Sequence, residues 1–121
     1  MKLEDIVYGK YEIVGGVVNV DGSVDLSNKN LKRIPFKFGI VTGNFYCNDN
    51  LLITLKGSPK EVGGLFACHY NQLTTLEGSP KIVKGSFDCS HNQLTTLERG
   101  PKKVGLYIDC RDNPIMKKIL G

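Results

Sequence analysis

Four cysteines are the residues most suited to chemistry, and they recur at a fixed interval: Cys47, Cys68, Cys89 and Cys110 are 21 residues apart. Four thiols are enough for a zinc site, but such sites usually use Cys-x-x-Cys pairs and hold every sulfur about 2.3 Å from one ion. On successive strands about 4.8 Å apart, the first and fourth thiols would be separated by about 14 Å. We therefore expect a column of buried free thiols, with no metal site, disulfide or cofactor.

Two histidines are the other candidates for chemistry. His69 and His91 lie near Asp88 and Ser90, a set of residue types that suits acid–base catalysis. However, His69 directly follows its cysteine whereas His91 comes two residues after its own, so the side chains should leave the chain at different angles. We expect no carboxylate or nucleophile to orient either imidazole as a catalytic triad requires. The sequence therefore predicts exposed histidines and a protein that is not an enzyme.

The 21-residue interval extends far beyond the cysteines. A period of 20–29 residues with this placement of leucine, asparagine and cysteine is typical of a leucine-rich-repeat solenoid, in which each repeat forms one coil. The repeating positions include Asn50, Asn71, Asn92 and Asn113; Leu52, Leu73 and Leu94; Leu55, Leu76 and Leu97; Pro59, Pro80 and Pro101; and Val41, Val62, Val83 and Val104.

The repeat predicts a β-rich solenoid, a right-handed leucine-rich-repeat-like coil over residues 24–113. It contains about five units of 21 residues, of which the first (residues 24–44) is degenerate and the last is incomplete. Within each unit, Phe66, Cys68, Leu73 and their equivalents should point into a continuous core. Asn71 should also point inward, because its amide can both donate to and accept from buried backbone groups.

The segments outside the repeats are predicted to cap its two ends. Residues 1–23 form an N-terminal β-hairpin cap, with turns expected at Gly15-Gly16 and again at Asp21-Gly22. Residues 114–121 have apolar residues at helical spacing and form a short C-terminal helical cap that we expect to cover the last coil. One position remains unexplained by the repeat: Leu106 stands where the three earlier coils have glycine.

The repeat resembles that of a known group of proteins. The recurring pattern Phe-x-Cys-x-x-Asn-Gln-Leu-Thr-Thr-Leu-Glu-Gly-Ser-Pro-Lys-x-Val-x-Gly looks like the short leucine-rich-repeat proteins encoded by tailed bacteriophages, and the likeness covers about residues 11–113. The motif is specific for the repeat class and much less specific for a function. The resemblance implies a viral accessory protein that binds a host protein, for example a defence factor, and inhibits or redirects it.

Residues that alternate with the inward Phe and Cys should lie on an exposed strand face. Unlike the core columns, these positions differ from coil to coil, which is how a solenoid presents a specific surface, although a surface without constraint would look the same. We expect a protein-binding face with aromatic and arginine anchors. The predicted partner-binding residues are Tyr46, Asn48, His69, Tyr70, Asp88, Ser90, His91, Tyr107, Asp109 and Arg111.

Lysines form a second surface, expected on the side of the coil away from the strands. Such a ridge could follow a nucleic-acid backbone, but no aromatic residue is interleaved for base stacking, and lysines at coil edges also hinder association. Nucleic-acid binding is therefore the alternative function, and a virion or self-assembling structural component is a third. The predicted lysine ridge consists of Lys60, Lys81, Lys84, Lys102 and Lys103.

Length and composition limit the remaining choices. The 121 residues leave room for one domain, and the net charge of +4 is too small to indicate a nucleic-acid protein by itself. No apolar run approaches the ~20 residues of a membrane span, and the acidic N-terminus does not resemble a secretory signal. We expect a cytoplasmic protein without a membrane partner, in the host bacterium if it is phage-encoded, and a monomer in preference to an oligomer.

Overall fold

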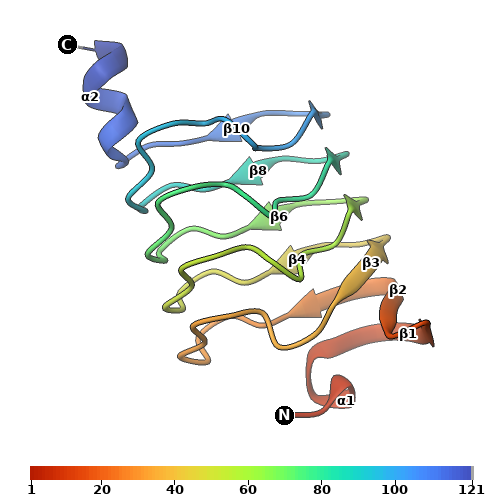
Figure 1. Cartoon of the computed structure of the whole chain (residues 1–121). Helices are drawn as coiled ribbons and strands as arrows, with labels where there is room; N and C mark the ends of the chain where they lie inside the picture. Colours follow the sequence, from red (N-terminus) through yellow and green to blue (C-terminus); the bar gives the residue numbers. More distant parts are fainter. Residues whose placement is uncertain (121) are drawn as a thin grey trace.

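The protein is a β-solenoid of about four turns, in which short parallel strands stack along one axis (Figure 1). The structure is a computed structural model that describes residues 1–120, with side chains as far as Lys117. The predicted β-rich coil is confirmed. Gly121, the last residue of the predicted C-terminal cap, lies outside the described residues.

The chain forms ten strands and two short helices over the described residues, in an order that follows the repeat. These elements are α1 (Leu3–Ile6), β1 (Val7–Val14), β2 (Val17–Asp25), β3 (Phe38–Val41), β4 (Phe45–Tyr46), β5 (Glu61–Val62), β6 (Phe66–Ala67), β7 (Ile82–Val83), β8 (Phe87–Asp88), β9 (Lys103–Val104), β10 (Ile108–Asp109) and α2 (Pro114–Leu120).

The strands belong to two parallel ladders that meet at β2. The first ladder contains β2, β4, β6, β8 and β10, and the second contains β2, β3, β5, β7 and β9. In the first ladder each pair is 21 residues apart, as in Phe45 opposite Phe66 and Phe66 opposite Phe87. The sequence predicted only this first ladder. The lysine ridge was predicted on a side of the coil away from the strands, but it lies along the strands of the second ladder.

The core is a set of columns, as the repeat predicted. Phe45, Phe66 and Phe87 are fully buried, and their rings stack with centroids 5.4 Å apart and planes nearly parallel. The leucine and cysteine columns are buried alongside them. Because each ring is covered by its equivalents above and below, no single coil could bury its own apolar residues.

The asparagine column joins successive coils, as expected. The Asn71 side-chain NH₂ donates to the carbonyl of Cys47 in the preceding coil and of Cys68 in its own, both at 3.0 Å. Its Oδ1 accepts from the Leu52 N–H at 2.9 Å. The amide therefore pairs backbone groups that would otherwise be buried without partners.

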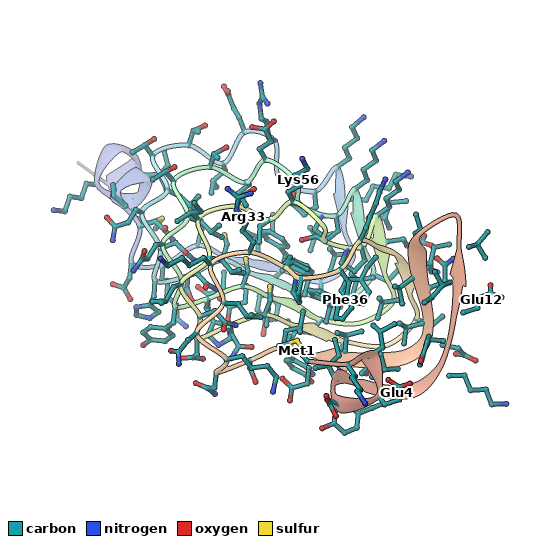
Figure 2. All side chains as sticks on the ribbon, turned by 60° about the horizontal axis from the view of Figure 1, so that its bottom comes forward. Met1, Glu4, Glu12, Arg33, Phe36 and Lys56 are labelled. Carbon is teal, nitrogen blue, oxygen red and sulfur yellow. The ribbon has the colours of Figure 1, made fainter. Side chains whose placement is uncertain are left out.

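The N-terminal hairpin is confirmed, but it is longer than predicted. The strands β1 and β2 meet at Gly15 and Gly16, whereas Asp21 and Gly22 lie inside β2 and not in a turn. Gly22 faces Gly9 across the hairpin, and a Cβ on it would overlap the Tyr8 carbonyl oxygen. This glycine thus permits close strand contact. Figure 2, with the N-terminal end forward, shows the hairpin carrying Glu12 away from the coil, whereas Phe36 lies within the coil outline.

The predicted C-terminal helix forms at the turn end of the last coil. It starts directly after the Asn113 turn and contacts the coil through Met116, whose sulfur lies 3.6 Å from that of Cys110. Figure 1 shows α2 beyond one end of β10 and not across it. Ile108, which occupies the phenylalanine column, is consequently 49% exposed. The predicted short C-terminal helix is confirmed, and it lies at the turn end of the last coil.

Candidate functional site

The same turn position in every coil adopts a left-handed backbone conformation, a feature that the repeat did not predict. The turn follows the first-ladder strand, and its φ values lie between 53° and 56°. Asn, Asp and, less often, His tolerate this conformation, but a tyrosine there is an outlier. The preference for Asn and Asp is the signal that could have revealed the column in the sequence. The column consists of Asn28, Asp49, Tyr70, His91 and Asp112.

Tyr70 and His91 stack on each other across two coils. Their ring centroids are 4.1 Å apart and their planes differ by 6°. The His69 ring meets the edge of Tyr70 at 5.9 Å. Tyr70 remains 52% exposed, so the stack presents a ring to solvent at the turn edge of the molecule.

Each histidine has a carboxylate beside it, contrary to the prediction. His69 Nδ1 lies 3.2 Å from Asp88 Oδ2, and His91 Nε2 lies 3.1 Å from Asp112 Oδ2. Neither contact could be predicted from the sequence, because each joins residues in different coils. His69 Nδ1 is buried and has no well-aligned hydrogen-bond partner among the described residues. We call the five residues His69, Tyr70, Asp88, His91 and Asp112 the aromatic turn patch.

Ser90 does not complete a catalytic arrangement with these groups. It is only 3% exposed, which corrects its prediction as a partner-binding residue. Its hydroxyl donates to Asp88 Oδ1 at 2.6 Å, so the carboxylate and not the histidine receives the serine proton. In a triad the histidine must lie between the serine and the acid. The geometry therefore orients Asp88 but does not activate Ser90 as a nucleophile.

The other predicted partner-binding residues are dispersed. Tyr46 is half-buried and accepts from the Asn44 amide at 3.0 Å. Asn48 lies beside the turn and donates to Asp49 at 2.7 Å. Both residues belong to an earlier coil, and in the described part of the chain neither forms a hydrogen bond with the aromatic turn patch. Tyr107 is 67% exposed, but it lies at the start of the last first-ladder strand and not at the turn.

Asp109 and Arg111 satisfy each other. The guanidinium donates to both carboxylate oxygens, at 3.0 and 2.8 Å. These bonds lower the pKa of Asp109 and raise that of Arg111. Because Arg111 is held by its neighbour, it is less free to act as the binding anchor that the sequence suggested. A groove of about 530 Å³ separates this last turn from α2 and reaches Asp112 and Met116.

The lysine ridge is ordered by the second ladder. Lys81 N donates to the Lys60 carbonyl at 2.9 Å, and Lys102 N donates to the Lys81 carbonyl at 2.8 Å, which fixes three lysines on successive coils. Lys84 and Lys103 flank them. None of the five forms an ion pair with an acidic side chain in the described part of the chain. The ridge is therefore a row of exposed, unpaired charge.

The cysteine column contains free thiols, as predicted. Cys47, Cys68 and Cys89 are buried, and Cys110 is half-buried because no coil follows it. Burial raises the pKa of Cys89 to about 12 and raises those of Cys47 and Cys68 as well. In residues 1–117, whose side chains are described, no three His, Cys, Asp or Glu residues are grouped closely enough to hold a metal ion.

Comparison of the chain with family models, curated proteins and solved structures finds no match. Within the described residues, neither helix has the length and apolar character needed to cross a membrane.

Proposed function

We propose that this protein binds a partner protein through the aromatic turn patch. The observation that carries the proposal is Tyr70, a half-exposed tyrosine in a backbone conformation that costs of the order of 1 kcal/mol for such a residue. In the two preceding coils the equivalent residues are Asn28 and Asp49, which adopt the same turn conformation without that cost. A strained, exposed aromatic residue is better explained by recognition than by folding.

The chemistry of the patch suits a protein surface. Tyrosine supplies a large, rigid contact area and is enriched among residues that dominate binding energy. Around the Tyr70–His91 stack, Asp88 and Asp112 supply acceptors at the edge of an apolar centre. An aromatic centre with a polar rim is the usual anatomy of a protein–protein interface.

The resemblance to phage-encoded repeat proteins directs the choice of partner. We propose a bacterial cytoplasmic protein that a phage benefits from inhibiting or redirecting, and a non-enzymatic role for this chain. The solenoid supports this role in that its core columns are constant while the residues of the turn column change from coil to coil.

The test compares binding by a variant that keeps the fold. Tyr70→Asn with His91→Asn removes both rings and puts a residue that tolerates the turn conformation at each position. The lost stacking and the relieved strain are both of the order of 1 kcal/mol, so the unfolding midpoint should stay close to that of the wild type. Affinity capture from bacterial lysate with mass spectrometry should recover a partner with the wild type and lose it with this variant.

The matched control removes charge from the other surface. Lys81→Ala with Lys84→Ala should capture the same partner as the wild type. Equal recovery by the patch variant and the wild type would contradict the proposal. Loss of binding by the lysine variant alone would transfer the function to the lysine ridge and favour a polyanionic partner instead.

A further inference from the structure

The last coil leaves an apolar edge open to solvent. Leu106, Tyr107 and Ile108 are 73%, 67% and 49% exposed. One coil earlier, the equivalent Ser86 and Phe87 are 8% and 0% exposed. A solenoid normally ends in a coil with a polar outer face, and exposed edge strands normally carry charge or proline. This edge instead has three consecutive large, exposed apolar residues between charged residues at its two ends.

Leu106 has no packing role within its own chain. The three earlier coils have glycine at this position, and a Cβ on Gly85 would lie 2.7 Å from the backbone of Gly64. A side chain at Gly85 would therefore disturb the contact between coils. Leu106 keeps the equivalent backbone hydrogen bond, to the Gly85 carbonyl at 3.1 Å, but its side chain gains almost nothing from burial at 73% exposure. The residue that the repeat could not explain is thus also unexplained by the fold of the isolated chain.

The edge also offers unused backbone hydrogen bonds. In the preceding coil, the N–H groups of Phe87 and Cys89 donate to the carbonyls of Tyr107 and Asp109 at 3.0 and 2.9 Å. The equivalent N–H groups of Ile108 and Cys110 point away from the stack and have no acceptor among the described residues. Because α2 lies beyond one end of β10, it leaves this edge free (Figure 1).

We propose that a second copy of this chain covers the edge, with β10 of the two copies side by side and antiparallel. The charges on the edge are complementary to themselves in this orientation. Lys102 and Lys103 stand at its beginning and Asp112 stands at its end, while Asp109 is already neutralised by Arg111. An antiparallel copy therefore brings the lysines of each chain toward Asp112 of the other. A two-fold contact of this kind is closed and produces a dimer.

The opposite end of the molecule does not fit this edge. There β1 runs antiparallel along β2, pairing Val7 with Val24 and Val14 with Val17. Its outer edge therefore does not continue the parallel coil, and head-to-tail stacking would not extend the solenoid. The dimer goes beyond the proposed partner binding and replaces the monomer expected from the sequence. Its two copies of Tyr70 would give the assembly two patches.

The test measures mass in solution by sedimentation velocity over a range of concentrations. The wild type should form a dimer. Leu106→Gly with Tyr107→Ser gives the last coil the residues of the coil before it, and it should raise the dimer dissociation constant at least about tenfold. A wild type that stays monomeric, or a dimer that this variant leaves intact, would overturn the proposal.

A matched control tests whether the hairpin edge, and not the β10 edge, forms the dimer. Tyr8→Ser with Ile13→Ser removes two exposed apolar side chains from β1, and it should leave the dimer unchanged. Species larger than two chains that disappear in this control would mean head-to-tail association and would overturn the two-fold arrangement.

A second measurement uses the wild type alone and does not depend on any variant folding. Amide hydrogen exchange at Ile108 and Cys110 should slow as the protein concentration rises, because these N–H groups gain acceptors in the dimer. Exchange at these two amides that does not change with concentration would also overturn the proposal.

Discussion

Neighbouring residues in one turn have opposite tasks. Asn71 is 8% exposed and bonds backbone groups of two coils, whereas Tyr70, directly before it, is 52% exposed and strained. The first residue is required by the coil because its amide satisfies buried groups. The second is not, since Asn and Asp form the same turn elsewhere. Structure and recognition are therefore separated residue by residue along the chain.

Replacement of Asn71 by alanine should destabilise the protein by about 3 kcal/mol, because the Leu52 N–H and two buried carbonyls lose their partner. The matched change Gln72→Ala, at an exposed position beside it, should cost less than about 0.5 kcal/mol. Urea unfolding of the two variants measures the difference. Similar midpoints for both would show that the asparagine bonds contribute little.

The buried thiols should make stability fall at alkaline pH. Burial raises the pKa of these thiols in the folded state, so the protonated thiols stabilise the folded protein. This stabilisation is complete below about pH 9, where the unfolded thiols begin to ionise. It is lost as the pH rises toward the folded pKa of Cys89, about 12. Each thiol lowers the free energy of unfolding by up to about 1.4 kcal/mol per pH unit in that interval.

Urea unfolding at several pH values should therefore show a steep decline for the wild type and a shallower one for Cys89→Ala. Comparison between the two proteins cancels the titration of lysines and tyrosines, which both contain. Parallel pH profiles would contradict the assignment of the decline to the thiols.

At the scale of elements, most strands exist only because they are stacked. Apart from β1, β2 and β3, every strand has two residues, too few to show the alternation that predicts a strand from sequence. The first ladder could still be predicted because Phe and Cys recur in it. The second ladder has only the single recurring column Val41, Val62, Val83 and Val104. One recurring residue does not show strand alternation, and the residues before these valines, such as Glu61, Ile82 and Lys103, differ in each coil.

The terminal elements could be predicted only in part, because contacts between distant residues set their turns and positions. The hairpin turn at Gly15-Gly16 was predictable because its residues suit a turn with positive φ, whereas Asp21-Gly22 has the same local signal and lies within a strand. The pairing of Gly22 with Gly9 decides this, and it involves residues that are distant in sequence. The position of α2 is likewise set by the turn before it and not by its own apolar pattern.

At the scale of the whole molecule, the period should permit removal of one entire coil. Deletion of residues 66–86 joins Leu65 to Phe87, which repeats the native junction of Leu65 with Phe66. We expect a folded, shorter solenoid with a lower free energy of unfolding and a smaller denaturant m-value, because less surface is buried.

The control deletion, residues 66–85, is one residue shorter. It should abolish cooperative unfolding, because every side chain after the junction changes face relative to its ladder. Circular dichroism and urea unfolding compare the two proteins. Equally cooperative unfolding of both would contradict the 21-residue register as the basis of the fold.

The period can be read from the sequence alone, and it predicts the coil, the inward columns and the role of the asparagines. This was possible because residues one period apart lie in contact, so spacing along the chain translates directly into position. The contacts at the turn, such as Tyr70 with His91 or His69 with Asp88, and the open edge at Leu106 are known only from the folded structure. These features depend on the backbone conformation of single residues and on which coil has no neighbour, and the 21-residue period predicts neither property.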